Sequence, residues 1–145
     1  MSFKCIQMPK ETILAYFAGF YEGEGYVYND KSNNNRIRLG IDQNDPTPLY
    51  LALKLWGGSI RERVRKSPAS EKICTCHTWR LCHTKALVFL EDIKPYMIIP
   101  YKINQVKMVL EKAEKGLNRR FFCRYCDKDY ASPSGRRRHE KKFHL

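Results

Sequence analysis

Two neighbouring stretches, residues 59–67 (SIRERVRKS) and 72–82 (KICTCHTWRLC), repeat their side-chain character with a period of two. This period is typical of strands that are buried on one face only. Two more alternating stretches, 25–30 and 36–42, flank an Asn-rich hairpin turn. Helix-like segments lie around the strand pairs, at 11–21, 47–57, 84–96 and 102–115. The order helix, strand, strand, helix, strand, strand, helix, helix predicts an α+β fold, a half-barrel in which helices cover one face of an antiparallel sheet.

The alternation also predicts what each face of the sheet carries. Ile37, Leu39 and Trp79 fall on the side that should face the helices. The other side collects residues that we expect to contact DNA: Tyr26, Tyr28, Asp30, Arg36, Arg38, Ser59, Arg61, Arg63, Arg65, Thr78 and Arg80. An ordinary solvated face is the alternative, but such faces mix charges and this one is nearly all positive. A positive saddle of this kind suits the phosphate backbone of a duplex, and arginine also reads guanine edges.

The net charge supports a polyanionic partner. The chain carries 27 Lys and Arg against 15 Asp and Glu, a formal charge of +12. Nucleic acid is favoured over an acidic membrane, and the nearly uncharged run 12–21 is too short to span a bilayer. The N-terminus lacks the apolar region of a signal peptide, so we expect an intracellular protein without a membrane partner. Six cysteines then indicate reduced thiols and a metal, with Cys5 structural.

The end of the chain differs in composition and predicts a second module. The last 30 residues hold 9 Lys and Arg against 3 Asp and Glu. Gly116 and Asn118 provide helix-stop residues at the junction. We expect one domain over residues 1–117 and a small DNA-binding module over 118–145. Within the first domain, we expect Thr47 and Thr84 to be the N-caps of the helices at 47–57 and 84–96.

The module carries the spacing Cys123-x2-Cys126-x12-His139-x4-His144. This spacing is that of a structural zinc site, and the segment resembles the ββα zinc finger. Ser132 and Pro133 are the expected N-cap and first residue of its helix. The alternative is that these cysteines and histidines occur at this spacing by chance in a basic tail. The predicted cofactor is zinc, held by the four residues of this spacing.

The resemblance to the zinc finger also implies how the module would bind. Phe121 and Tyr130 match two of the three core positions, but Arg136 replaces the usual leucine, so stability should depend more on zinc. Helix positions that face bases would be Ser132, Gly135 and Arg138, of which glycine reads nothing. We expect Arg137 and Arg138 to contact DNA: Arg137 suits a phosphate, and Arg138 could take a guanine. The finger should then add affinity and little sequence information. A second metal site at Cys74, Cys76 and Cys82 is a weaker alternative to small side chains facing DNA.

The segment FAGFYEGEG, residues 17–25, begins within an apolar helix-like run and contains two glutamates and three glycines. Together with the element order and the basic sheet it resembles the LAGLIDADG homing endonuclease family, over residues 10–115. The segment FLEDIKPYMII looks like the stretch that follows the fourth strand in that family. A helix ended by glycine, with solvated glutamates, is the alternative reading. The resemblance implies the LAGLIDADG fold, with αββαββα order and a DNA-binding saddle, and a seam between two copies formed by Ala18, Gly19, Glu22 and Gly23.

The resemblance also implies an active site. Glu24 would bind magnesium, facing its counterpart on a second copy, while Glu22 has a structural role at the helix end. Gln43 and Lys102 would complete the catalytic set, although Pro100 stands where the family has its lysine. A chain with a single motif forms a homodimer that cuts both strands of a long, pseudo-palindromic DNA site. A non-cleaving DNA-binding regulator and an intron RNA maturase are the alternatives.

Overall fold

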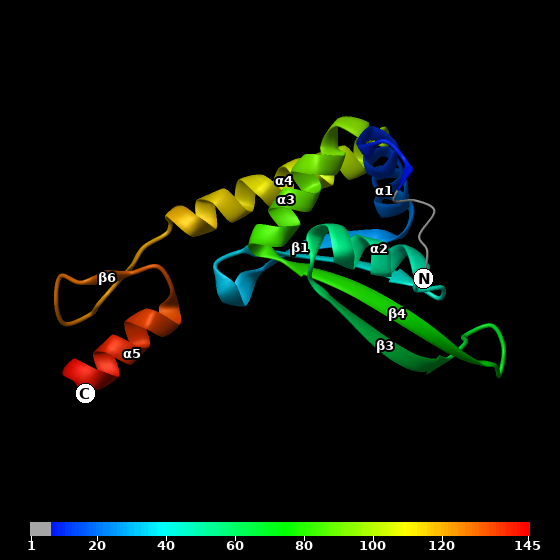
Figure 1. Cartoon of the computed structure of the whole chain (residues 1–145). Coiled ribbons are helices and arrows are strands. Elements are labelled where there is room, and N and C mark those ends of the chain that lie inside the picture. Colours follow the sequence, from blue (N-terminus) through cyan, green and yellow to red (C-terminus); the bar gives the residue numbers. More distant parts are fainter. Residues whose placement is uncertain (1–6) are drawn as a thin grey trace.

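The computed structural model describes residues 7–145, so the expectation for Cys5 lies outside the described residues. This part of the chain is an α+β protein with five α-helices and a four-stranded antiparallel sheet, which confirms the predicted class. The strands lie in the order β1-β2-β4-β3. The helices α1 to α4 lie over one face of the sheet and leave the other face open (Figure 1). The strands are β1 (Gly25–Asp30), β2 (Arg36–Gln43), β3 (Ser59–Lys66) and β4 (Ile73–Cys82), and the four helices are α1 (Lys10–Glu24), α2 (Thr47–Trp56), α3 (His83–Ile93) and α4 (Pro100–Asn118).

An aromatic cluster joins the sheet to the helices. Trp56 at the end of α2 lies 5.0 Å from the ring of Phe17 and 4.8 Å from that of Phe89, both edge to face. Trp79 of β4 packs against Phe89 at 5.2 Å. Both indole N–H groups are paired, Trp56 donating to Asp92 at 2.9 Å and Trp79 to the carbonyl of Gly57 at 2.8 Å. Buried aromatic rings with satisfied polar atoms make this the centre of the core.

Both expected N-caps are wrong, by one residue for α2 and by two for α3, because the N-caps are Pro46 and Cys82. Thr47 lies inside α2, and its N–H and hydroxyl both donate to Asp45, which closes the preceding turn. The helix α3 begins at His83, before Thr84, because β4 runs directly into it without a loop. A short polar residue next to a helix therefore indicated each start but not its exact position.

The helix α4 continues through Gly116, which the sequence suggested as a stop. A Cβ at this position would overlap the carbonyl oxygen of Asn34, in the turn between β1 and β2. The glycine therefore allows α4 to approach that turn closely, and the helix ends only at Asn118.

Glu22 is buried within the chain, with 5% of its surface exposed, and caps a helix other than its own. Its carboxylate accepts hydrogen bonds from the backbone N–H of Ile98 at 3.2 Å and of Ile99 at 2.6 Å. These two residues directly precede α4, whose first residue is Pro100. A carboxylate at this end also interacts favourably with the helix dipole. Glu22 therefore has a structural contact at the start of α4 instead of at the end of its own helix.

Replacing Glu22 by alanine should destabilise the fold by about 0.5–2 kcal/mol, because two backbone N–H groups at the start of α4 lose their capping carboxylate. Urea unfolding followed by circular dichroism measures the difference. Glu24→Gln is the matched control, since that carboxylate is exposed, and it should leave the unfolding midpoint unchanged. Equal midpoints for Glu22→Ala and wild type would contradict the capping role.

Candidate functional site

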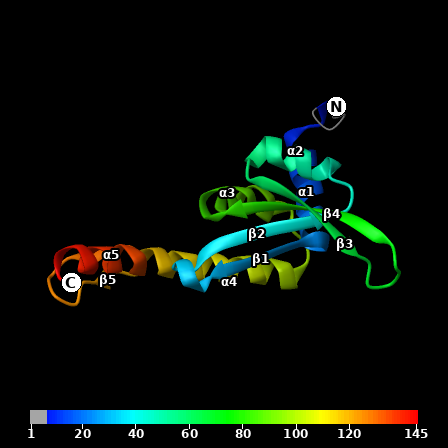
Figure 2. The ribbon, with the colours of Figure 1, turned by 90° about the horizontal axis from the view of Figure 1, so that it is seen from below.

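The open face of the sheet carries the charge pattern that the sequence predicts. Strand pairing places Asp30 beside Arg36, Tyr28 beside Arg38 and Tyr26 beside Gly40. Across the sheet Arg38 pairs with Cys82, and Gly40 with Arg80. The outer strand β3 adds Ser59 opposite Arg80, Arg61 opposite Thr78, Arg63 opposite Cys76 and Arg65 opposite Cys74. All the expected DNA-binding residues of the sheet therefore lie on one face, which Figure 2 shows from below.

Arg38 is held in place on this face. Its guanidinium lies 3.3 Å from the carboxylate of Asp30 and donates to the sulfur of Cys82 at 2.7 Å. The Ser32 hydroxyl is the main cause that lowers the pKa of Asp30, and Arg38 lowers it further. The carboxylate is therefore ionised and fixes the arginine. An arginine held in one orientation suits bidentate recognition better than a free one.

A shallow depression of about 410 Å³ lies in the middle of the face. The ring of Tyr26 lies across Gly40, where a Cβ would overlap it. Arg38, Arg61 and Arg80 surround the same depression, with the hydroxyl of Ser59 at its edge. The depression thus combines aromatic surface with three cationic groups, a set that suits phosphates and base edges.

Thr78 does not belong to the contact surface, which corrects one expectation. Only 3% of its surface is exposed, and its hydroxyl donates to Asp42 at 2.6 Å. The central position of β4 and its long arginine neighbours account for this burial. Thr78 therefore orients Asp42, which together with Asp30 lies on this face by strand pairing.

At the tip of α1, the side chain of Lys102 contacts the backbone next to Glu24. Glu24 is exposed and ends the helix, and Gly25 begins β1 without a loop. The amine of Lys102 donates to the carbonyl of Gly25 at 2.8 Å. Pro100 is the first residue of α4, where its missing N–H costs no hydrogen bond, and Lys102 follows within the first turn. The first helical turn therefore places Lys102, rather than residue 100, beside the backbone next to Glu24.

Gln43 lies at the end of β2, opposite His77. The alternation of the strand places it on the side of Ile41, which the helices cover, rather than on the basic face. Its amide oxygen accepts from the N–H of Asn44 at 2.9 Å. The structure therefore gives it a turn contact, and its catalytic role stays a prediction.

The expected seam on α1 divides into two pairs of residues. Ala18, with 0% exposure, and Glu22 face the chain's own core, so they are not available to a second copy. Gly19 and Gly23 are exposed, and a Cβ at either would meet nothing within 4 Å. One side of the helix packs on α3 and the sheet, which buries Ala18 and leaves the glycine side open.

Two exposed apolar residues that the sequence pattern did not single out lie beside α1. Ile98 is 82% exposed and Ile99 is 42% exposed, and the backbone N–H groups of both are bonded to Glu22 on α1. The apolar run MII just before a helix-starting proline was the available signal. Exposed apolar groups beside a glycine surface are typical of an interface.

The C-terminal module has the predicted ββα form. It consists of the short strands β5 (Phe121–Phe122) and β6 (Asp129–Tyr130), followed by α5 (Pro133–Phe143). Ser132 is the N-cap of α5, and its hydroxyl accepts from the N–H of Gly135 at 3.1 Å, as expected. Arg137 and Arg138 are exposed on this helix.

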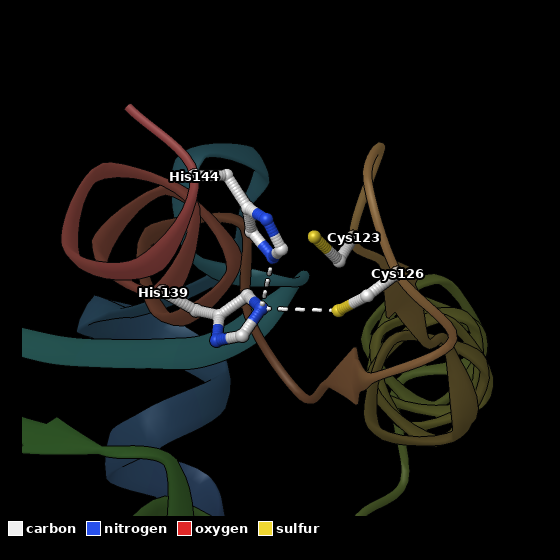
Figure 3. A group of neighbouring side chains, drawn as sticks. All are labelled: Cys123, Cys126, His139 and His144. Carbon is white, nitrogen blue, oxygen red and sulfur yellow. Dashed lines mark hydrogen bonds between the residues drawn. The ribbon is translucent and has the colours of Figure 1, made fainter.

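Cys123, Cys126, His139 and His144 converge at one point (Figure 3). Their ligand atoms all lie within 4.8 Å of one another. The Nε2 atoms of the two histidines are 3.2 Å apart, and that of His139 is 3.2 Å from the sulfur of Cys126. Tetrahedral zinc with bonds of about 2.0–2.1 Å to nitrogen needs nitrogen ligands roughly 3.3 Å apart. The four residues therefore form a group that can hold a metal ion such as zinc.

The environment of the group favours the metal-binding forms of its side chains. Burial is the main cause that lowers the pKa of His139, and His144 and Lys128 lower it further, so the imidazole is neutral as a ligand must be. The sulfur of Cys123 accepts from the N–H of Tyr125 at 3.4 Å. Rings cover the site from two sides, Tyr125 stacked on His144 and Phe143 beside His139.

Arg136 stands at the position where a zinc finger usually has an apolar core residue, and in the structure it pairs with Glu140. The Nε atom of Arg136 lies 3.7 Å from the carboxylate of Glu140, which is buried. The same carboxylate accepts from the N–H of Arg124 at 3.0 Å. A buried polar pair contributes less stability than packed apolar side chains, which leaves the module dependent on its metal.

The cysteines of β4 do not form a second metal group. Within residues 7–145 the finger provides the single converging set of three or more His, Cys, Asp and Glu ligands. His83 is buried, and its Nδ1 accepts from the N–H of Ile37 at 3.3 Å. His77 contacts the carbonyl of Asn44 at 3.1 Å instead. The weaker alternative of a metal on this strand therefore has no support.

No model of a known protein family matches the chain, and a comparison with curated proteins gives no match either. Among the described residues, no helix combines the length and the apolar character that crossing a bilayer requires. What the chain does must therefore be inferred from its own residues and their geometry.

Removing the metal should unfold the module and leave the sheet domain folded, because the small core cannot persist without it. The double variant Cys123→Ser, Cys126→Ser should lose the dispersed amide NMR signals of residues 121–145 only. Cys74→Ser is the control, since that cysteine lies outside the group, and it should keep the full spectrum. Retention of the finger signals in the double variant would show that the metal is not structural.

Proposed function

We propose that the chain is a site-specific DNA endonuclease of the LAGLIDADG homing type, with an appended zinc finger. It acts as a homodimer and cuts both strands of a long, pseudo-palindromic site. One observation carries the proposal: the exposed carboxylate of Glu24 ends a helix at the border of a basic sheet face, with Lys102 bonded to the next backbone carbonyl. A carboxylate and an amine at the edge of a phosphate-binding surface are the groups that phosphodiester hydrolysis requires.

Binding of DNA is supported by the shape and charge of the open face. Six arginines lie on it by strand pairing, and its two acidic residues are already paired, Asp30 with Arg38 and Asp42 with Thr78. Both ends of the molecule reach toward the open side, the β3–β4 hairpin at one end and α5 at the other (Figure 1). A surface with six arginines, on which one of the two carboxylates is ion-paired and the other accepts a hydrogen bond, suits the phosphates of a duplex.

Magnesium fits Glu24 as a hard cation that prefers oxygen ligands. Glu24 directly precedes Gly25, the first residue of β1, which pairs with Ile41 of β2. A single chain offers too few ligands here, so the remaining ones would come from DNA phosphates and from the Glu24 of a second copy. A cation bound there would polarise the scissile phosphate and activate water. The chain's own part is to bind the phosphates on both sides, while Lys102 keeps a positive charge beside the cut.

The homodimer is supported by the surface of α1. Gly19 and Gly23 leave the helix backbone accessible, and Ile98 and Ile99 add exposed apolar area beside it. Contact through this surface would bring the two Glu24 tips together, since Glu24 follows Gly23 directly. Two-fold symmetry then requires a pseudo-palindromic site.

A non-cleaving DNA-binding regulator is the second candidate. The observation in its favour is Pro100, which stands where the family has its lysine, together with the single carboxylate that each chain brings. The contact of Lys102 with Gly25 argues against it. An intron RNA maturase would share the same charged face and would differ in the nucleic acid that it prefers.

The deciding experiment incubates the zinc-loaded protein and magnesium with a random-sequence duplex library and sequences both bound molecules and new ends. Paired ends at one recurring sequence support the endonuclease. Enriched duplexes without new ends indicate a regulator. Stronger capture of a structured RNA library than of duplex DNA would indicate the maturase.

Glu24→Gln should abolish cleavage while DNA affinity stays the same or rises, because a metal ligand is lost together with a charge that repels phosphate. Gel shift and cleavage assays on a duplex recovered from the library separate the two effects. Cutting at the wild-type rate would exclude Glu24 as a ligand.

Gly19→Leu should convert the dimer to a monomer, because a large side chain keeps a second helix from close approach. Sedimentation at micromolar concentration measures this. Lys10→Leu is the matched control, because Lys10 is exposed and points to the opposite side of the same helix from Gly19. This variant should remain dimeric. If Gly19→Leu also sediments as a dimer, the interface lies elsewhere.

A further inference from the structure

We propose that the turn between β1 and β2 holds the zinc finger at one fixed position relative to the sheet. The finger then contacts the duplex at a set distance outside the segment that the sheet covers. This inference rests on the proposed binding of DNA. The sequence of residues 31–36 (KSNNNR) indicates only a polar hairpin turn, but in the structure this turn contacts both parts of the chain.

Asn34 makes the contact with the finger. Its side-chain amide donates to the backbone carbonyl of Ala131. Ala131 lies between the end of β6 and Ser132, the N-cap of α5. The hydrogen bond thus holds the point at which the DNA-facing helix of the finger begins. Figures 1 and 2 both show the turn directly beside the finger.

The turn is itself attached to α4, so it forms a rigid support. The side-chain amide of Asn29 donates to the carbonyl of Asn35 and to that of Val109 in α4, both at 2.9 Å. Further along the helix, buried Gly116 lies against the carbonyl of Asn34. Because α4 leads directly into the finger, the finger is held both by the chain and by the turn.

The conformation of the turn explains the run of asparagines. Asn34 and Asn35 have φ angles of 54° and 55°, in the left-handed region that asparagine tolerates better than most residues. The three-residue helix η2 (Lys31–Asn33) has Asp30 as its N-cap, and the carboxylate of Asp30 accepts from the N–H and the hydroxyl of Ser32. Asp30 is also the partner of Arg38 on the basic face. One turn therefore connects the position of Arg38 with that of the finger.

The arrangement has a consequence for DNA recognition. A finger on a loose linker would reach phosphates over a range of positions, whereas a supported finger reaches one. Arg137 and Arg138 would then meet the duplex at a fixed phase of the double helix, beyond the end of the sheet near Arg36. Each half-site gains an outer contact whose spacing from the central contacts does not vary.

The first test needs no DNA. Residual dipolar couplings are measured on the zinc-loaded full chain, its Asn34→Asp variant and its Asn35→Asp variant. The aspartate at position 34 removes the donor to Ala131 yet keeps tolerance of the left-handed conformation. Asn35→Asp is the control. It adds the same charge at a neighbouring left-handed position but leaves the hydrogen bond from Asn34 to Ala131 intact. In wild type and in Asn35→Asp, one alignment tensor should fit the couplings of both the sheet domain and the finger. In Asn34→Asp, residues 121–145 should need a separate, smaller tensor. Two tensors in wild type, or one in Asn34→Asp, would overturn the proposal.

The second test uses hydroxyl-radical footprints on a duplex recovered from the library. Wild type and Asn35→Asp should protect the centre and one sharp outer patch on each half-site. Asn34→Asp should keep the central protection and lose or blur the outer patch, with its zinc site intact by cobalt spectroscopy. An equally sharp outer patch in Asn34→Asp overturns the fixed spacing, as does its absence in wild type. If wild type shows no central protection, the proposed DNA binding is wrong, whereas the position of the finger measured by residual dipolar couplings would still stand.

Discussion

The packing of Trp56, Trp79, Phe17 and Phe89 between sheet and helices is the constraint on which the other features depend. It buries the apolar side chains of one sheet face under α1, α2 and α3 and leaves the alternate side chains on the open face. Because side chains alternate along a strand, burial of one face fixes which residues the other presents. The basic surface is therefore a consequence of core packing as much as of composition.

The two glutamates at the end of α1 show how position decides chemistry. Glu22 and Glu24 are two residues apart on a helix, so they point in different directions. One is buried against the backbone N–H groups of Ile98 and Ile99, and the other is exposed. Glu22 fixes the start of α4, and that start brings Lys102 to the carbonyl of Gly25. The buried carboxylate thus supports the site at which the exposed one is proposed to act.

The finger depends on a different source of stability. Its interior contains the pair Arg136 and Glu140 where an apolar residue would be expected, so converging ligands replace an apolar core. Such a module is small enough to fold only around a metal. Its contact with the main domain is also polar, through Asn34 and Ala131. The chain thus joins a domain held by aromatic packing to one held by ligands.

The sequence by itself predicted the α+β class, the element order, the division of the sheet into an apolar and a basic face, and the four converging ligands. These follow from local periods and spacings, because a strand alternates and a metal site needs ligands at set intervals. It did not predict that Ala18 and Thr78 are buried, that Gly116 continues a helix, or that Asn34 touches the finger. Each of these depends on which distant segment lies against the residue, and no local pattern contains that information. Only the tertiary structure placed Lys102 beside Gly25 and the turn beside the finger, because both contacts join segments far apart in the chain.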